Sequence, residues 1–315
     1  MSATDSQQVE AARSEWARRA AAAAALDLAH TATPPRSQAQ IVWRNFKRNR
    51  FAVAGGSVVL LLYLVAIFAT QIAPQNYAAF NPGQPLQPPS AAHWFGTDRQ
   101  TRDIFSRVIV GSRVSLSVGF VAVALIMLIG VSLGALAGYF GGLVDNAIMR
   151  FTDIMLAIPG LFLLITAAAL FAPGLRTTMV VIGLTSWMGA ARLVRGEVLR
   201  VKAQDFVLAA RALGAPSRWI IVRHILPNVL AVIIVEGTLW LSYAILLESA
   251  LSFLGLGAQP PTPSWGGMLA DGRVDMQLAW WETVFPGLAI FLTVFCFNLV
   301  GDGLRDAFDP RQRRS

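Results

Sequence analysis

Residues 114–144 read VSLSVGFVAVALIMLIGVSLGALAGYFGGLV, a run of 31 residues without a charged side chain. A helix that crosses a bilayer needs about 20 largely apolar residues, so this run predicts a membrane-spanning helix. Within it Gly130, Gly134 and Gly138 recur at every fourth position. Small residues at that spacing let two helix backbones approach closely, which predicts a tightly packed helix pair.

Five more stretches of the chain are apolar enough to be spans. They are residues 51–73, 154–175, 177–191, 229–247 and 283–301. The stretch 51–73 has no charged residue, and the short stretch 177–191 is closed by Arg192. The stretch 229–247 is interrupted by Glu236, and 283–301 is closed by Asp302. We therefore predict an all-α fold, a polytopic membrane bundle of six transmembrane helices.

The composition agrees with a membrane protein. Hydrophobic residues make up 55% of the chain and charged residues only 14%, with a mean hydropathy of +0.54. Soluble domains carry about 25% charged residues. The single cysteine, Cys296, excludes a disulfide framework.

The basic residues predict the orientation. Twenty of the 26 Lys and Arg residues fall on one side if the N-terminus is inside, and cytoplasmic loops carry the excess of positive charge. The protein is expected in the bacterial inner membrane, with both termini in the cytoplasm. The net charge is +8, and the basic residues flank the spans, where they can face anionic lipid headgroups. No nucleic acid partner is expected. No cleavable signal peptide precedes the first span, which would act as the insertion signal.

The chain is predicted to have four parts. Residues 1–40 are a polar cytoplasmic tail. Residues 41–112 hold the first span and an external loop, in which Thr97 and Gln100 fit a capping box that would open an amphipathic helix over 97–112. Residues 113–302 form the core, including a cytoplasmic loop at 195–228, and residues 303–315 are a cytoplasmic tail.

The motifs of several enzyme classes are missing from the sequence. There is no phosphate-binding loop, and neither Lys47 nor Lys202 follows a glycine, so the chain is not expected to hydrolyse ATP. The three histidines, His30, His93 and His224, are far apart, so no metal site is expected. We predict no catalytic residue and no cofactor in this chain.

Three groups of carboxylates keep alternatives open. Asp145 and Asp153 flank one inside turn and weakly suggest a membrane enzyme that acts on lipid or prenyl substrates. Glu236 lies within the fifth span, where an ionisable group costs about 2.5–3.5 kcal/mol. It either lines a translocation path or is a buried carboxyl satisfied by a neighbouring helix or partner chain. Glu248, three turns later, is expected near the outer surface.

The loop DFVLAARALGAPSRWIIVRHILPN (205–228) is the most informative hydrophilic segment. Its first residues have helical spacing, and Gly214 suits a helix end in which a left-handed residue is needed. Pro216 is tolerated in the first turn of a second short helix. The segment therefore predicts a helix–Gly–helix element that enters a groove on another protein and couples the two mechanically.

These residues resemble the EAA loop of ATP-binding-cassette (ABC) importer permeases. Ala209, Ala210, Gly214 and the Leu226–Pro227 pair match that pattern in type and spacing, whereas Leu208 replaces its opening Glu. Four other segments look like the second permease subunit of dipeptide, oligopeptide and nickel importers. They are FGTDRQTRDIFSRVIVGSR (95–113), AGYFGGLVDNAIMR (137–150), SFLGLGAQPPTPSWGGML (252–269) and FNLVGDGLRDAFDP (297–310).

The resemblance, which covers residues 43–310, implies a type I ABC importer permease fold and a mechanism. Two homologous permeases would form a pore, one or two ATPase subunits would dock beneath, and an extracytoplasmic binding protein would deliver the cargo by alternating access. The implied ATPase-coupling residues are Asp205, Ala209, Ala210, Arg211, Gly214, His224 and Pro227. Di- and oligopeptides are the expected cargo, and nickel or another small solute is the alternative. A self-sufficient transporter is the other rival, although no internal repeat is evident.

Overall fold

The computed structural model of the protein describes residues 15–16, 18–19, 38–80 and 84–309. In these ranges the regular structure is helical, apart from a β-bridge between Thr97 and Asp103. The fold divides after Arg44 into two units, and the second unit, from Asn45 onward, contains the helix bundle. Most of the predicted tail at 1–40, and residues 310–315 of the predicted C-terminal tail, lie outside the described residues.

The predicted helix bundle is present. Its elements, in chain order, are α2 (Gln38–Arg48), α3 (Arg50–Ile67), α4 (Ala69–Ile72), α5 (Ile104–Phe140), α6 (Gly142–Ala157), α7 (Gly160–Ala169), α8 (Leu175–Thr185), α9 (Met188–Lys202), α10 (Asp205–Ala212), α11 (Ser217–Ile220), the π-helical turn η1 (Ile221–Ile225), α12 (Leu226–Phe253), α13 (Trp265–Gly272) and α14 (Trp281–Phe308).

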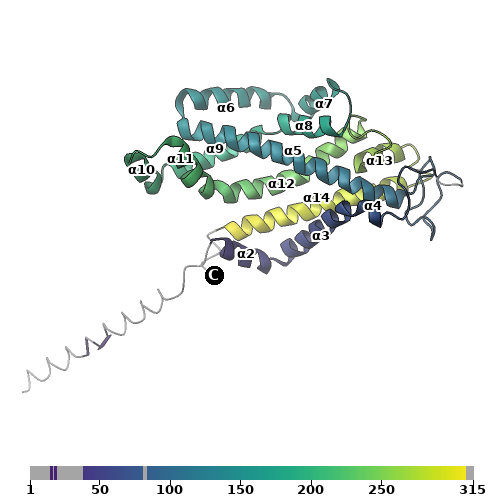
Figure 1. Cartoon of the computed structure of the whole chain (residues 1–315), viewed down its shortest axis with the longest axis horizontal. Helices are drawn as coiled ribbons and strands as arrows, with labels where there is room; N and C mark the ends of the chain where they lie inside the picture. The colour runs from purple at the N-terminus through teal and green to yellow at the C-terminus, as the bar shows by residue number, and fades with distance from the viewer. Residues whose placement is uncertain (1–14, 17, 20–37, 81–83, 310–315) are drawn as a thin grey trace, which may run out of the picture. The chain divides into compact units, whose positions relative to one another are not determined.

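Between four and six of these segments can cross a membrane by length and composition. The four single helices are α3, α5, α14 and the continuous run of α11, η1 and α12. Two pairs pass the test together but are bent, α6 with α7 by 87° and α8 with α9 by 41°. Within the second unit, α10 and α11 lie at one end and α13 lies at the other, and α5 extends between them (Figure 1).

The long helix α5 corrects the predicted amphipathic helix at 97–112. The Asp103 carboxylate accepts a hydrogen bond from the Ser106 N–H, so Asp103 caps the helix and Ile104 begins it. Thr97 caps nothing, because its hydroxyl accepts from the Gln87 N–H at 2.9 Å. The 37 residues of α5 span about 55 Å, so residues 104–113 are its first turns. The predicted division at 112/113 therefore falls inside one helix.

The inside turn that Asp145 and Asp153 are predicted to flank is helix in the structure, because both residues lie within α6. Gly141, with φ of +68°, ends α5, and α6 begins at the next residue. Helix α6 then runs back beside α5 and α9 (Figure 1). The predicted third span at 154–175 accordingly corresponds to the end of α6 and the whole of α7.

The glycine repeat of α5 packs against α9, as its spacing predicts. A Cβ atom placed on Gly130 would lie 2.7 Å from the Ala190 Cβ, and one on Gly134 would lie 2.5 Å from the Ala191 carbonyl oxygen. A Cβ on Gly138 would lie 2.9 Å from the Arg195 carbonyl oxygen. These glycines therefore let the two backbones approach more closely than any larger residue allows.

Helices α3 and α14 form a second close pair. A Cβ on Gly55 of α3 would lie 3.0 Å from the carbonyl oxygen of Cys296 on α14. Cys296 itself is buried, with 3% of its surface exposed.

Candidate functional site

Helix α10 presents one face to solvent and one to the bundle. Val207 and Ala210 are buried in an apolar cluster with Tyr139 and Val198. Asp205, Ala209 and Arg211 are exposed, and so are the large apolar side chains Phe206, Leu208 and Leu213. The two matched alanines therefore have different roles, since Ala210 anchors the helix and Ala209 lies on its free face.

Gly214 ends α10 in the left-handed conformation that the sequence predicts. Its φ is +80°, and a Cβ there would meet nothing within 4 Å, so the backbone angle alone selects glycine. The Gly214 N–H donates to the Arg211 carbonyl and the Ala215 N–H donates to the Ala210 carbonyl at 3.1 Å. This pair of bonds is a Schellman cap, which fixes the angle at which the chain leaves the helix.

Tyr139, at the end of α5, contacts the segment that contains α10. Its carbonyl accepts a hydrogen bond from Lys202 Nζ, and the Arg211 guanidinium lies 5.5 Å from the centre of its ring. Arg211 therefore contacts its own chain, although the sequence suggested that it was available to a partner. Tyr139 lies 66 or more positions before α10 along the chain, and no local pattern identifies it as part of this site.

Two arginine–aspartate pairs join α9 to α6. Arg195 holds the Asp145 carboxylate through bonds of 2.5 and 2.6 Å, and Arg192 bonds to Asp153 at 2.6 Å. The carboxylates that suggested a prenyl-transfer site are therefore occupied by arginines. The described residues also contain no cluster of three or more His, Cys, Asp or Glu side chains that could hold a metal ion.

The helix continues through Pro227 without a break. In a regular α-helix the ring of Pro227 would clash with the carbonyl of Arg223. The wider π-helical turn at Ile221–Ile225 lies directly before α12, and such turns accommodate a local misfit in a helix. His224 lies in this turn, with its ring 4.6 Å from that of Trp219. Its Nε2 atom is buried and has no hydrogen-bond partner among the described residues.

Glu236 is half-buried on α12, and its Oε1 atom accepts a hydrogen bond from Trp240 Nε1 at 3.0 Å. The bond joins two residues one turn apart on the same helix. No ion pair of Glu236 is found in the part of the chain that the structure describes. Both interpretations of this residue therefore remain open.

Glu248 lies five residues before the end of α12, and it is buried inside the protein, with 1% of its surface exposed. Its carboxyl group accepts hydrogen bonds from Ser115 Oγ at 2.9 Å and Ser252 Oγ at 2.7 Å. Ser115 also accepts a bond from the Trp265 N–H at 3.3 Å. Glu248 thereby connects α12 to α5 and, through Ser115, to the start of α13.

We expect Glu248→Ala to lower the stability of this junction, because the substitution leaves the serine hydroxyls buried without an acceptor. Each unsatisfied buried group costs about 1–3 kcal/mol. Thermal unfolding of the purified protein in detergent measures the effect. Glu248→Gln, which keeps an acceptor oxygen, is the matched control and should lose less; equal losses in the two variants would contradict the hydrogen-bonding role.

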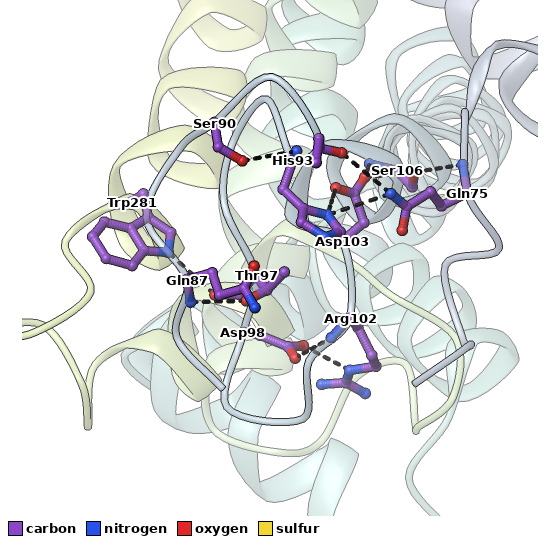
Figure 2. A network of polar contacts seen from close by, with 11 residues as sticks. Gln75, Gln87, Ser90, His93, Thr97, Asp98, Arg102, Asp103, Ser106 and Trp281 are labelled. Atoms are coloured by element: carbon purple, nitrogen blue, oxygen red, sulfur yellow. Dashed lines mark hydrogen bonds and ion pairs between the residues drawn. The ribbon is translucent and has the colours of Figure 1, made fainter. Parts of the chain in front are cut away.

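A polar network covers the α13 end of the bundle (Figure 2). Asp103 bonds to His93 Nδ1 at 3.0 Å while it caps α5 through Ser106. The Trp281 indole N–H donates to the Thr97 carbonyl at 3.2 Å, which ties the loop to the start of α14. The 84–103 segment is therefore held to both helices by buried side chains.

Two further ion pairs belong to this network. Asp98 accepts bonds from the backbone N–H and the Nε of Arg102, at 2.8 and 2.6 Å (Figure 2). Arg99 pairs with Asp275, and this contact raises the pKa of the Arg99 guanidinium above its ordinary value. Both arginines lie in the predicted external loop, and their charges are balanced locally by these carboxylates.

Comparison with known proteins assigns the chain to a family. Residues 130–314 match the family model described as "Binding-protein-dependent transport system inner membrane component". The chain belongs to this family. Residues 37–89 also match the model of the N-terminal transmembrane domain of oligopeptide transport permease C. The resemblance seen in the sequence is thereby confirmed, and the chain is a transport permease subunit rather than a lipid or prenyl enzyme.

Individual relatives cover most of the permease. It is 46% identical over 286 residues to the dipeptide transport system permease protein DppC of Alkalihalophilus pseudofirmus. The match covers 89% of this chain and 94% of the relative. It is 46% identical over 272 residues to the glutathione transport system permease protein GsiD of Escherichia coli O6:K15:H31, which covers 85% of this chain and 89% of the relative.

A solved structure shows the same fold. It is of the MetNI methionine ABC transporter in an inward facing conformation, with a TM-score of 0.53 and 18% identity. The match covers 64% of this chain and 97% of that chain. The permease therefore has an ABC importer fold, and as a binding-protein-dependent component it works with an ATPase, a binding protein and a partner permease.

Proposed function

We propose that this permease takes up di- and oligopeptides as half of an ATP-driven pore. The observation that carries the proposal is the 43–46% identity, over 89% of the chain, to permeases named for dipeptide transport. The relatives named for glutathione transport support the same cargo class, since glutathione is itself a short peptide.

Uptake into proteoliposomes tests the cargo. The permease is reconstituted with its partner permease, ATPases and binding protein, and labelled dialanine, glutathione and Ni²⁺ are supplied separately. ATP-dependent accumulation of the peptides without Ni²⁺ uptake is the expected result. Accumulation of Ni²⁺ alone would contradict the proposal and favour the small-solute alternative.

The assembly that we propose contains this permease, one homologous permease and one or two ATPase subunits. Purification in mild detergent followed by mass spectrometry measures the composition. Co-purification at fixed stoichiometry is expected, and a chain that purifies alone and homogeneous would contradict it.

The proposed orientation places both termini and α10 in the cytoplasm, and α13 outside. It rests on the excess of Lys and Arg in the segments before α3, between α9 and α12, and after α14. The exposed face of α10 would then fit into a groove of an ATPase. Its apolar side chains Phe206, Leu208 and Leu213 supply the contact area, and Ala209 allows close approach.

Glu236→Gln tests whether this carboxyl group lines the pore. The amide keeps an acceptor for Trp240 but removes the negative charge, so we expect uptake to fall several-fold while assembly is unchanged. Uptake and the amount of assembled complex are measured together. The matched control is Glu197→Gln on α9, which pairs with Arg200 at the protein surface. If uptake by the Glu236 variant matched the wild type, Glu236 would have only a structural role.

A further inference from the structure

Two adjacent clefts open beside α13, each of about 280 Å³. They share Pro260, Ala270 and Asp271 as lining residues. Small-molecule sites in proteins have volumes of about 300–1,000 Å³, so the two clefts together have room for a short peptide.

The clefts have opposite charge. The first, here called the basic cleft, is lined by Arg107 and Arg273 with Asp271 as its one carboxylate. The second, the acidic cleft, is lined by two arginines and four carboxylates. In the acidic cleft Arg99 pairs with Asp275 and Arg102 with Asp98. The other two carboxylates belong to Glu282 and the shared Asp271, and Asp271 also lies 3.7 Å from Arg102 and 3.6 Å from Arg107.

Arg107 is the buried residue of the basic cleft, and 6% of its side chain is exposed. Its nearest carboxylate oxygens, on Asp98 and Asp271, lie 3.7 and 3.6 Å away, beyond hydrogen-bond distance. The Nη1 atom is buried and has no hydrogen-bond partner among the described residues. A buried guanidinium nitrogen without an acceptor is costly, so the site is suited to an anionic oxygen from outside the chain.

Glu282 is its counterpart in the acidic cleft. The residue is buried at the first turn of α14, and its Oε1 atom also lacks a partner within the part of the chain described. Arg107 thus has an unused donor atom and Glu282 an unused acceptor atom, and each of the two residues lines one of the clefts. A free peptide carries the matching groups, an α-carboxylate at one end and an α-ammonium at the other.

We propose that the two clefts form an external binding site for a short zwitterionic peptide. Arg107 and Arg273 bind the α-carboxylate, and Glu282 and Asp271 bind the α-ammonium. The site takes the peptide by its two charged ends, so it tolerates varied side chains. The proposal rests on the proposed function, since it takes peptide as the cargo and places α13 outside.

Peptide binding to the assembled importer tests the site directly. The complex is placed in lipid nanodiscs without the binding protein, and equilibrium dialysis measures its affinity for dialanine, dialanine amide and N-acetyl-dialanine. We expect saturable binding of dialanine and about tenfold weaker binding of each blocked peptide, because each block removes one charge-assisted contact.

The variants assign the contacts to residues. Arg273→Gln and Arg107→Gln should each weaken dialanine binding about tenfold and leave dialanine amide unaffected, because the amide lacks the carboxylate that these arginines bind. Arg176→Gln is the matched control, an exposed arginine of α8 outside both clefts, and should bind as the wild type does. Arg273 is exposed, so its variant decides the question even if Arg107→Gln fails to assemble.

Three results would overturn the site: no saturable binding of dialanine, equal binding of the blocked peptides, or normal binding by Arg273→Gln. A small cavity of about 10 Å³ lined by both Arg107 and Glu282 would then hold a single bridging water molecule. Peptide uptake by the complete system, with the binding protein present, separates the two proposals. If uptake persists while direct binding fails, only the site is wrong; if peptides are not taken up at all, the proposed function is wrong.

Discussion

Gly214→Pro is expected to abolish coupled transport. Proline fixes φ near −65°, whereas Gly214 has a φ of +80°. The proline also lacks the N–H that donates to the Arg211 carbonyl, so the Schellman cap is lost and the chain leaves α10 at a different angle. We expect ATP-driven uptake to fall at least about tenfold, which corresponds to about 1.4 kcal/mol of activation free energy.

The measurement compares uptake with ATP hydrolysis in the same proteoliposomes. Hydrolysis should continue while uptake is lost, because the spans and the buried anchor Ala210 are unchanged. Gly214→Asn is the matched control, since Asn adopts positive φ more readily than other residues and keeps its N–H. It should retain most of the uptake, and normal uptake by the proline variant at normal expression would contradict the role of the loop.

Gly134→Ala is expected to destabilise the bundle more than the same substitution at any other glycine of α5. The new Cβ would lie 2.5 Å from the Ala191 carbonyl oxygen and 2.9 Å from the Val194 Cβ. Both neighbours belong to α9, and the nearer is a backbone atom, so the two helices must separate. Overpacking of this kind costs about 1–3 kcal/mol of the free energy of unfolding.

Gly196→Ala on α9 is the matched control for this substitution. Gly196 is helical, and a Cβ there would meet nothing within 4 Å. The same chemical change should therefore stabilise the helix by about 0.5–1 kcal/mol, through its higher helix propensity. Thermal unfolding midpoints of the two variants in detergent provide the test. Equal midpoints would show that the α5–α9 contact does not limit stability.

The elements predicted correctly from the sequence depend on local or periodic signals. Long apolar runs identified the spans, the spacing of Gly130, Gly134 and Gly138 predicted the close helix pair, and Gly214 predicted a helix end with positive φ. Each of these signals lies within one helix or one turn, where chain geometry alone sets the outcome.

The errors involve partners that are distant along the chain. Asp145 and Asp153 were expected to flank a turn, but both lie within α6, and Asp145 is paired with Arg195, 50 positions away. Thr97 was expected to cap a helix, yet its hydroxyl is engaged by Gln87 and Asp103 caps α5 instead. The serine partner of Glu248 on α5, Ser115, was likewise not predicted, because it lies 133 positions away. Such pairings are not visible in a single sequence.

The same principle applies to the two candidate sites. The coupling loop was found from its own residues, but Tyr139, which supports it, was not. The pair of clefts was not predicted at all, because Arg107, Asp271 and Glu282 come from three separate helices.

Because Cys296 is buried, the natural permease has no accessible thiol that would compete with a cysteine introduced for labelling. The sequence contains no other cysteine, and this one is shielded between α3 and α14. A water-soluble maleimide should therefore leave the unmodified chain unlabelled. A cysteine introduced at Phe206 or Arg273, both of which are exposed, would be the only accessible thiol of this subunit. Membrane sidedness and the movement of either end during a transport cycle can then be followed without first engineering a cysteine-free background.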